Sequence, residues 1–442
     1  MDNSRPDRSL TEGLWALASR PPAPDDLAKT ARHVLDWAGC ALAGRADPGG
    51  RAFLSALSPG RNPFSLAGPE GAMAMGCLGS ILEMDDVHRQ ALLHPGPAVI
   101  PAALSVARNA TGTNFLRAVL GGYEAVIRLG SAVGAAHYAV FHNSGSCGAI
   151  GAAAAAARVI GLPDGAAVSA MGHAMSATGG LWQARNEPVL TKHLHLADAA
   201  RRGVTGALLA QAGLAGPRRI LEGPQGFFAA MARDGRPDEV SAPKPGWRIG
   251  EVSFKPWPAC RHAHPAIDAA LALRGALRGE KPHRILVETT RDAVLFCDKA
   301  NPATAAEAKF SLQHAVAVTL LQGAPGLADF EPQAISRPDL ARLRGRTEVA
   351  GTPEFTARYP AHFGARVTVT IRGGAPRSAE VADAWGDPEN PMDAASVTAK
   401  FMRLARAAGV PDETAGAIAD TCMALPRGAA PSDLLGLLGR GP

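Results

Sequence analysis

The chain contains 442 residues, of which 47% are hydrophobic and 19% are charged. This balance excludes a disordered protein, and the length favours two domains over a single core. The formal charge of +5 comes from scattered cations and not from a Lys/Arg block, so the sequence predicts no nucleic-acid partner and suits a small anionic substrate.

The six cysteines include no C-x-x-C pair, and the polar first residues contain no secretory apolar region. Both features predict a cytoplasmic protein with reduced thiols. The most apolar segment, residues 147–162, is an alanine run interrupted by Arg158, too short and too weakly hydrophobic to span a bilayer. We therefore expect a buried helix there and no membrane partner.

Helical patterns dominate the chain as far as the linker at residues 243–247. Apolar residues recur at helical spacing, and proline or acidic residues open several segments. This part of the chain is therefore predicted to be an all-α body. The expected helices cover residues 9–19, 25–43, 70–83, 97–109, 113–134, 147–162, 164–177 and 191–212.

Strand patterns appear only after this linker. Residues 283–290 and 365–372 alternate with period two, and Gly373-Gly374 indicates a hairpin. Further helices are expected at residues 265–277, 305–322, 393–408 and 412–424. We predict a mainly α fold in which a large all-α domain is formed by both chain ends, and a smaller α+β lid domain is inserted. The domains are expected to cover residues 1–250 with 386–442, and residues 251–385.

Two adjacent carboxylates and two imidazoles lie in residues 82–101, beside a Pro-Gly-Pro turn. If the preceding helix extends that far, Asp85 and His88 share a face and can form a hydrogen bond, while Asp86 points elsewhere. His94 precedes the turn, where an imidazole is commonly exposed or functional. The alternative is an acid pair that is only solvated or caps the helix end.

Two more clusters carry imidazoles. His142 and Ser144 precede the alanine-rich helix, and the glycines at 145 and 148 either admit backbone N–H groups to a ligand or allow close helix packing. Lys192 and His195 share a face at the start of the next helix. A lysine is unfavourable at a helix N-terminus, which suggests that Lys192 binds an anion; a solvated lysine is the alternative.

A fourth cluster lies in residues 253–265, where Lys255, Arg261 and His264 are expected to converge near a helix start. Cys260, His262 and His264 alternate as metal ligands can, but a fourth ligand and paired spacing are missing, so we expect no metal. The chain also lacks a G-x-G-x-x-G after a strand, a Walker loop and a G-x-S-x-G motif. Phosphate-bearing cofactors therefore have little support.

These clusters resemble the motifs of the MmgE/PrpD family, which includes 2-methylcitrate dehydratase, cis-aconitate decarboxylase and iminodisuccinate epimerase. The matching segments, in the family's order, are Asp85-Asp86, Leu93-His94-Pro95-Gly96, Phe141-His142-Asn143-Ser144-Gly145, Thr191-Lys192-His193-Leu194-His195, Lys255-Pro256-Trp257-Pro258-Ala259-Cys260-Arg261, His264-Pro265-Ala266-Ile267-Asp268 and Ala308-Lys309-Phe310-Ser311-Leu312. The resemblance implies a homodimer that needs no cofactor, with catalytic positions at Asp85, His94, His142, Lys192 and Lys255.

Substrate contacts are expected from a second set of residues: Asp86, His88, Ser144, His195, Cys260, Arg261, His264 and His314. Two of them depart from the family pattern. His314 stands where family members often carry a tyrosine, and Cys260 stands where the decarboxylases have a histidine. Because an imidazole and a phenol differ in acidity and reach, these departures disfavour decarboxylation.

The chemistry implied by the resemblance is formation of a carbanion beside a carboxylate, which needs cations and hydrogen-bond donors in dry surroundings. We expect a cofactor-independent lyase that dehydrates a hydroxylated di- or tricarboxylate, with His94 or His142 moving protons and Asp85 orienting His94. The alternatives, in order, are an isomerase or epimerase of a small dicarboxylate, a cis-aconitate decarboxylase-like enzyme and a non-catalytic anion-binding protein.

Overall fold

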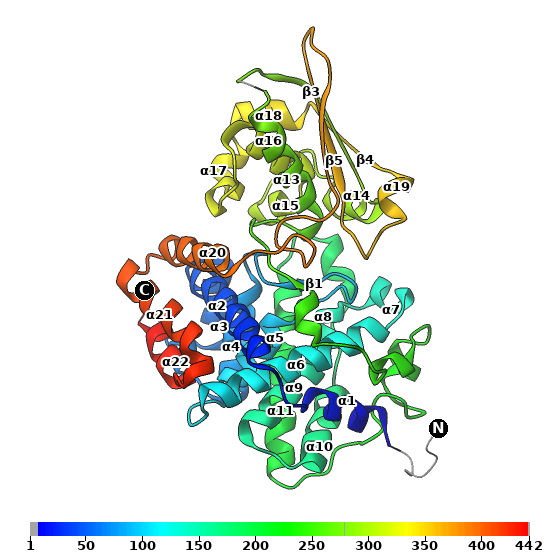
Figure 1. The fold of residues 1–442 in the computed structure, drawn as a ribbon, viewed down its shortest axis with the longest axis vertical. Coiled ribbons are helices and arrows are strands. Elements are labelled where there is room, and N and C mark those ends of the chain that lie inside the picture. The colour runs from blue at the N-terminus through cyan, green and yellow to red at the C-terminus, as the bar shows by residue number, and fades with distance from the viewer. Residues whose placement is uncertain (1–7, 278, 441–442) are drawn as a thin grey trace. The chain divides into compact units, whose positions relative to one another are not determined.

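The computed structural model describes residues 8–277 and 279–440, which divide into two compact units (Figure 1). Unit 1 comprises Met1–Val252 and Asp393–Pro442, and unit 2 comprises Ser253–Met392. Unit 1 is built from helices, whereas unit 2 combines helices with a sheet. The prediction of a mainly α fold with a smaller α+β part is confirmed.

Helices make up almost all the regular structure of unit 1, with the short strand β1 (Val87–His88) between two of them. The α-helices are α1 (Leu10–Ala18), α2 (Pro24–Ala46), α3 (Pro48–Leu57), α4 (Gly68–Ser80), α5 (Gly96–Leu104), α6 (Gly112–Ala132), α7 (Ala135–Val140), α8 (Asn143–Ser146), α9 (Gly148–Ile160), α10 (Asp164–Ser176), α11 (Thr191–Gln211), α12 (Phe227–Met231), α20 (Ala394–Ala407), α21 (Asp412–Ala424) and α22 (Pro431–Gly439). Short 3₁₀ turns are η1 (Pro63–Ser65), η2 (Trp182–Asn186), η3 (Pro237–Val240), η4 (Arg248–Glu251) and η7 (Leu425–Arg427). Strand β2 (Val252–Ser253) begins at the last residue of the first part of unit 1 and ends at the first residue of unit 2.

The alanine-rich helix α9 lies in the core of unit 1, as the sequence predicts. Its residues from Gly148 to Ala157 are buried, and α5, α6, α10 and α11 pack around it. A Cβ added to Gly203 would lie only 2.3 Å from the Cβ of Ala152, so small residues let α11 approach α9 closely. No helix within the described residues is both long and apolar enough to cross a membrane.

The N-terminal and C-terminal parts of the chain pack together in unit 1, where α20 runs beside α2 (Figure 1). The helical pattern after residue 393 predicts this packing against the N-terminal body. A Cβ added to Gly39 would lie 3.2 Å from Cδ2 of Phe401, which shows how closely the two helices approach. The contact between α2 and α20 therefore places side chains of the C-terminal part of the chain beside residues of its N-terminal part.

Unit 2 contains a four-stranded sheet with the strand order β4-β3-β5-β6. Strand β4 is parallel to β3, while β5 is antiparallel to both β3 and β6. Every second residue of β5 is buried, which is the alternation that predicted the strand. The hairpin expected at Gly373-Gly374 is confirmed, because β5 pairs with β6 across this turn. The residues of β6 themselves gave no signal, since they alternate between half-buried and exposed and have no apolar face, and β4 was not predicted. The bounds are β3 (Pro282–Thr289), β4 (Thr347–Gly351), β5 (Ala365–Ile371) and β6 (Arg377–Val381).

The expected helix at residues 305–322 is two helices in the structure. Ser311 interrupts it, because its Oγ accepts the backbone N–H of His314 and caps the second helix. The helices of unit 2 are α13 (His264–Arg274), α14 (Arg291–Cys297), α15 (Ala305–Lys309), α16 (Leu312–Gln322), α17 (Pro332–Ile335), α18 (Pro338–Arg344) and α19 (Pro353–Thr356), with 3₁₀ turns η5 (Arg261–Ala263) and η6 (Leu327–Phe330).

Candidate active site

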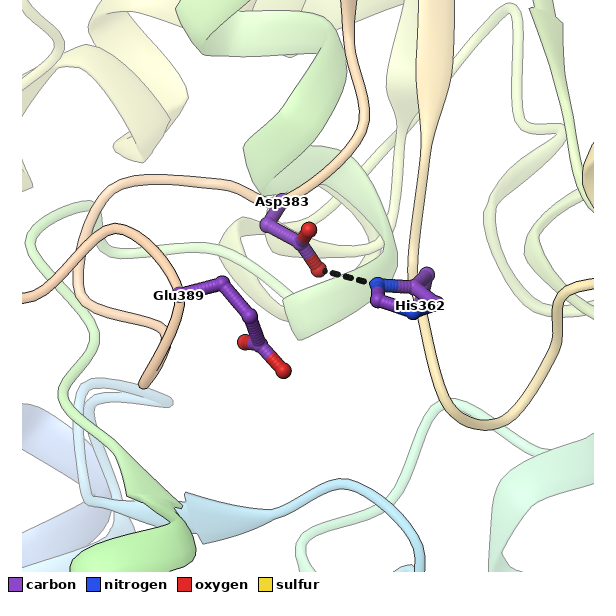
Figure 2. Close-up of side chains that lie close together, drawn as sticks. All are labelled: His362, Asp383 and Glu389. Atoms are coloured by element: carbon purple, nitrogen blue, oxygen red, sulfur yellow. Dashed lines mark hydrogen bonds and ion pairs between the residues drawn. The ribbon is translucent and has the colours of Figure 1, made fainter.

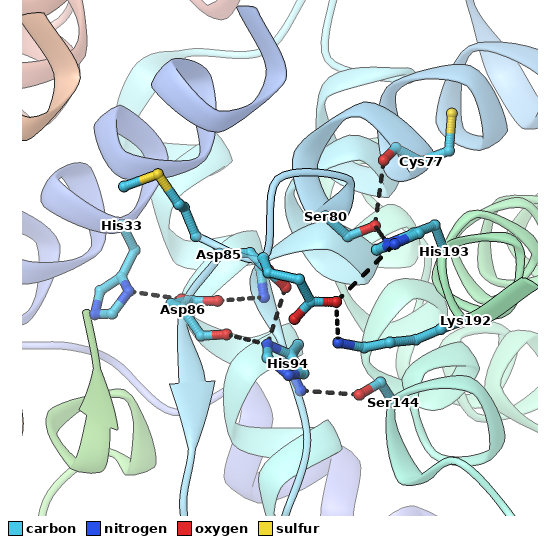
Figure 3. A network of polar contacts seen from close by, with 12 residues as sticks. His33, Cys77, Ser80, Asp85, Asp86, His94, Ser144, Lys192 and His193 are labelled. Carbon is cyan, nitrogen blue, oxygen red and sulfur yellow. Dashed lines mark hydrogen bonds and ion pairs between the residues drawn. The ribbon is translucent and has the colours of Figure 1, made fainter. Parts of the chain in front are cut away.

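The segment between α4 and α5 is an irregular turn that carries most of the expected acids and imidazoles of unit 1 (Figure 3). The sequence predicted helix as far as residue 83, but α4 ends at Ser80, so Asp85 and Asp86 lie beyond it. Glu83 and Leu92 have φ angles of 58° and 50°. Left-handed conformations of non-glycine residues cost of order 1–3 kcal/mol and persist only where the surroundings hold them. Neighbouring elements must therefore hold this turn in place.

His94 is oriented by the carboxylate of Asp85. Its Nδ1 lies 2.9 Å from Asp85 Oδ2 and 2.9 Å from the carbonyl oxygen of Asp86. The carbonyl oxygen of Asp86 can only accept, so Nδ1 donates its proton to it, and Nε2 is the ring nitrogen left to act as a base. The backbone N–H of His94 donates to Ser144 Oγ at 3.0 Å. The ring is thus fixed in both tautomer and position.

Asp86 connects the turn to two other helices. Its Oδ2 accepts from Tyr123 Oη at 2.7 Å and lies 2.8 Å from His33 Nδ1. Its Oδ1 accepts the backbone N–H of Gly96 at 3.0 Å, and a Cβ on Gly96 would lie 2.6 Å from that oxygen. A buried carboxylate with these three neighbours favours a positioning role over the substrate contact that the sequence suggested.

His88 does not pair with Asp85, contrary to the expectation from their spacing. No helical turn joins them, because His88 lies in β1 and Asp85 faces His94. His88 Nδ1 accepts from the N–H of Ala91, and Nε2 donates to Glu251, each at 3.0 Å. Burial lowers the pKa of His88, so the ring is neutral and both nitrogens are occupied. These contacts give His88 a structural role in the turn and do not favour the expected substrate contact.

Lys192 faces an internal carboxylate that the sequence did not single out. Its Nζ lies 2.5 Å from Oε1 of Glu83, and both side chains are largely buried. The next residue, His193, forms a hydrogen bond of 3.0 Å between its Nδ1 and Oγ of Ser80 (Figure 3). The start of α11 is therefore tied to the end of α4. The unfavourable place of a lysine at a helix N-terminus was the signal for this anion.

His142 is a buried imidazole stacked on Trp182. Their ring centroids are 4.4 Å apart with an interplanar angle of 10°. Burial lowers the pKa of His142 well below its usual value, and the charges of Lys192, His195 and His94 add to the shift. His195 Nδ1 lies 3.4 Å from His142 Nδ1, and burial also lowers the pKa of His195. His142 is consequently neutral near pH 7.

The glycines beside His142 serve close packing. The N–H of Gly145 already donates to the carbonyl of His142 at 2.8 Å, and a Cβ there would lie 2.9 Å from the Cβ of His195. A Cβ on Gly148 would lie 3.0 Å from the Cβ of Ala199. Of the two alternatives left open by the sequence, the structure supports helix packing, which lets α8 and α9 approach α11.

In unit 2, Lys255 is completely buried in the segment that follows β2. The preceding residue, Phe254, donates its N–H to the carbonyl of Gly386 at 3.0 Å. Gly386 has a φ of 97°, and a Cβ there would lie 2.2 Å from the carbonyl oxygen of Phe254. The backbone beside Lys255 is thus held against a loop that accepts only glycine at this position.

Arg261 is buried and forms an ion pair with Asp387 through Nη2. Asp387 also accepts from Ser253 Oγ at 2.5 Å. Nε and Nη1 of Arg261 have no hydrogen-bond partner among the described residues. A guanidinium with remaining donors in a buried position suits a carboxylate ligand, as the sequence suggested.

The remaining expected residues of unit 2 have internal contacts. His264 Nε2 donates to the carbonyl of Ala259 at 3.1 Å, and the N–H of Cys260 donates to the carbonyl of Lys309 at 2.8 Å. The contacts of His314 do not support the expected substrate role. Its Nε2 donates to the carbonyl of Asp329 at 2.7 Å, while its Nδ1 accepts from Arg344 at 3.2 Å, so both ring nitrogens are occupied inside unit 2.

Cys260, His262 and His264 are not the group that offers metal-ligand geometry in the described chain. That group is His362, Asp383 and Glu389, whose ligand atoms all lie within 4.8 Å of one another (Figure 2). Nδ1 of His362, however, donates to Asp383 Oδ1 at 2.7 Å, so an ion would have to displace this proton. The contact already links the segment before β5 to the loop after β6.

Sequence reasoning missed Glu83 and Trp182 as members of the His94 and His142 cluster. An anion partner for Lys192 was foreseeable, but not its identity. No local pattern marks Trp182, since its contact with His142 joins two separate segments. His33 and Tyr123 were missed for the same reason, because they reach Asp86 from α2 and α6.

Comparisons with known proteins agree on one family. Residues 15–240 match the MmgE/PrpD N-terminal domain, and residues 257–425 match the MmgE/PrpD C-terminal domain. A cis-aconitate decarboxylase-like protein of Aspergillus oryzae is 27% identical over 99% of this chain and 98% of its own length. Human cis-aconitate decarboxylase is 26% identical over 72% of this chain and 69% of its own. The 2-methylcitrate dehydratase of Cupriavidus necator is 31% identical over 40% of this chain and 39% of its own.

The two domain matches follow one another along the chain and together cover most of it, and the N-terminal match includes His94 and Lys192. The protein belongs to the MmgE/PrpD family.

Proposed function

We propose that this protein is a lyase that acts on a small di- or tricarboxylic acid by forming a carbanion beside a carboxylate, and that it eliminates water. The observation that carries the proposal is the Asp85–His94 pair, 2.9 Å apart, in a cluster that also holds Lys192 and His142. Its relatives include 2-methylcitrate dehydratases, whose name describes such a reaction.

The tautomer of His94 suits it to act as the base. Nδ1 donates to the Asp86 carbonyl and lies beside the Asp85 carboxylate, so Nε2 can take the proton from the carbon next to the substrate carboxylate. The Asp85 carboxylate then stabilises the imidazolium that forms. The departing hydroxide leaves as water by taking a proton from the His94 imidazolium, which restores the neutral base, and the neutral ring of His142 can donate a hydrogen bond to the departing oxygen.

The cations provide the other requirement of a carbanion mechanism. As the carbon loses its proton, negative charge spreads onto a carboxylate that is already anionic, so a fixed ammonium beside that carboxylate lowers the barrier. Lys192 is held by Glu83 and suits this role. In unit 2, Lys255 and Arg261 are our candidates for binding a carboxylate.

Decarboxylation is the second candidate, and the relatives favour it in one respect. The A. oryzae cis-aconitate decarboxylase-like protein aligns over nearly the whole chain, whereas the 2-methylcitrate dehydratases align over less than half. Loss of CO₂ from a carboxylate leaves the same kind of carbanion, which then needs a proton donor. Cys260, which stands where the decarboxylases have a histidine, remains our reason to place elimination first.

Incubation with 2-methylcitrate, citrate, cis-aconitate and iminodisuccinate-type acids in deuterated water, followed by NMR, tests the proposal. We expect an unsaturated acid formed with loss of water. Release of CO₂ would support decarboxylation, and deuterium exchange without net reaction would support an epimerase. His94→Asn is the matched control, since Asn keeps a polar side chain but cannot act as a base. Anion binding with no turnover of any acid would overturn the lyase proposal.

A further inference from the structure

We infer that Lys400, from the C-terminal helix α20, is a positioning residue that fixes the backbone of the acidic turn between Glu83 and Asp85. The inference rests on the function proposed above, because these two carboxylates partner the proposed cation and base. Lys400 is far from this turn in the sequence and belongs to none of the motif segments on which the site was predicted.

The buried side chain of Lys400 contacts both the turn and helix α2. Its side chain is 1% exposed, and Nζ donates to the carbonyl oxygen of Met84 at 2.7 Å. The same Nζ lies 2.6 Å from Oδ1 of Asp36, which is 2% exposed. One ammonium therefore joins α20, α2 and the turn. A buried ammonium is costly unless it is paired and hydrogen-bonded, and here it is both.

The hydrogen bond from Lys400 to the Met84 carbonyl fixes the position of Asp85. The Met84 carbonyl belongs to the peptide unit whose N–H is that of Asp85, so fixing this oxygen fixes the plane from which the Asp85 side chain departs. On the other side, Met84 follows Glu83, whose φ of 58° is unfavourable. The hydrogen bond from Lys400 to the Met84 carbonyl stabilises the backbone of the strained turn, while the ion pair with Lys192 positions the Glu83 side chain.

The close packing of α20 on α2 allows the Lys400 side chain to contact the turn. Gly39 follows Asp36 by three residues and lies on the same side of α2, where its missing Cβ admits Phe401. Phe401 is the neighbour of Lys400 and is completely buried. The close approach of α20 thus delivers the ammonium to the turn, so the C-terminal tail contributes to the geometry of the site.

A buried ion pair can also be purely structural, and paired substitutions separate the two roles. Lys400→Met alone leaves Asp36 buried without its partner and should lower the melting temperature. Asp36→Leu combined with Lys400→Met removes both charges with apolar side chains of similar size, which commonly preserves folding. Arg406→Gln is the control on α20, because its ion pair with Asp412 is exposed.

Hydrogen–deuterium exchange of the residue 83–86 backbone measures the turn without any substrate. In the double variant we expect these amides to exchange roughly tenfold faster while α9 stays protected. With a substrate acid, we expect kcat to fall about 10- to 100-fold with KM nearly unchanged, since Lys400 does not touch substrate. Arg406→Gln should change neither quantity.

Wild-type exchange at residues 83–86 in the folded double variant would overturn the inference, as would wild-type kcat. Should the double variant not fold, Lys400→Gln carries the same expectations, because its amide can still donate to Asp36 but is too short to reach both acceptors. If the wild-type protein turns over no acid, the proposed function fails, and the exchange measurement still decides the role of Lys400.

Discussion

Asp85 Oδ2 lies 2.9 Å from Nδ1 of His94, although eight residues and a change of chain direction separate them. A hydrogen bond to the Asp86 carbonyl places a proton on the same Nδ1 and leaves Nε2 as the basic atom. It is the relationship in unit 1 that most directly suggests acid/base chemistry. It also shows why His88, closer to Asp85 in sequence, is not its partner.

Asp85→Asn should lower kcat by roughly 10²- to 10⁴-fold, the usual range for loss of effective general base catalysis. The amide is nearly isosteric but cannot stabilise the imidazolium by charge. Steady-state kinetics with the substrate acid measure the effect. Ser144→Ala removes only the acceptor of the His94 backbone N–H and should cost less than Asp85→Asn. Equal losses in both variants would contradict this ranking.

Lys192→Met should raise KM for an anionic substrate about 10- to 100-fold, since a hydrogen bond to a charged group is worth about 1.5–3 kcal/mol. Methionine keeps the apolar stem and removes the charge. Glu83→Gln keeps the lysine but removes the carboxylate 2.5 Å from it, so the ammonium is less well placed. We expect Glu83→Gln to lower kcat more than it raises KM. An unchanged KM in Lys192→Met would exclude the lysine from substrate binding.

Trp182→Ala should raise the pKa of His142 toward its ordinary value. Burial is the main cause of the lowered pKa, and Trp182 covers one face of the ring. NMR titration of the imidazole resonance, assigned with His142→Gln, measures the change. Because a raised pKa protonates the ring at higher pH, activity that needs neutral His142 should be lost at higher pH than in the wild type. An unchanged pKa of His142 would mean that neighbours other than Trp182 shield the ring from solvent.

His262→Phe should make the protein less sensitive to acid. His262 is stacked on Phe296 and lies edge-on to Phe363, and burial lowers its pKa to about 3. Between the ordinary value of 6.5 and about 3, the unfolded chain binds a proton that the folded protein does not, so the stability contribution falls as pH falls through this window. The cost at pH 5 is about 2 kcal/mol.

Thermal unfolding of His262→Phe and wild type at pH 5 and pH 7.5 tests this expectation. Between pH 7.5 and pH 5, the melting temperature should fall less in the variant than in the wild type. Phenylalanine keeps the ring packing and has no titrating group. Parallel pH dependence of the two proteins would show that His262 is not the group whose protonation opposes folding.

Local periodicity was sufficient for most of the fold. Residues 25–43 show helical spacing and form the core of α2, and residues 365–372 alternate and form β5, because both patterns reflect which side of an element faces the core. Strand β6 has no apolar face, so its place depends on pairing with β5 and not on its own sequence.

The titratable residues in the motifs could be found from their types and clustering, but their partners could not. Residue types and their spacing are enough to show that acids, imidazoles and lysines gather on a few segments of a mainly α protein. Tertiary contacts are needed to pair Asp85 with His94 and Glu83 with Lys192, and to anchor the turn between those acids through Lys400. The physical reason is that α4 stops at Ser80, and the irregular backbone beyond it is shaped by contacts from α11 and α20, which no local pattern encodes.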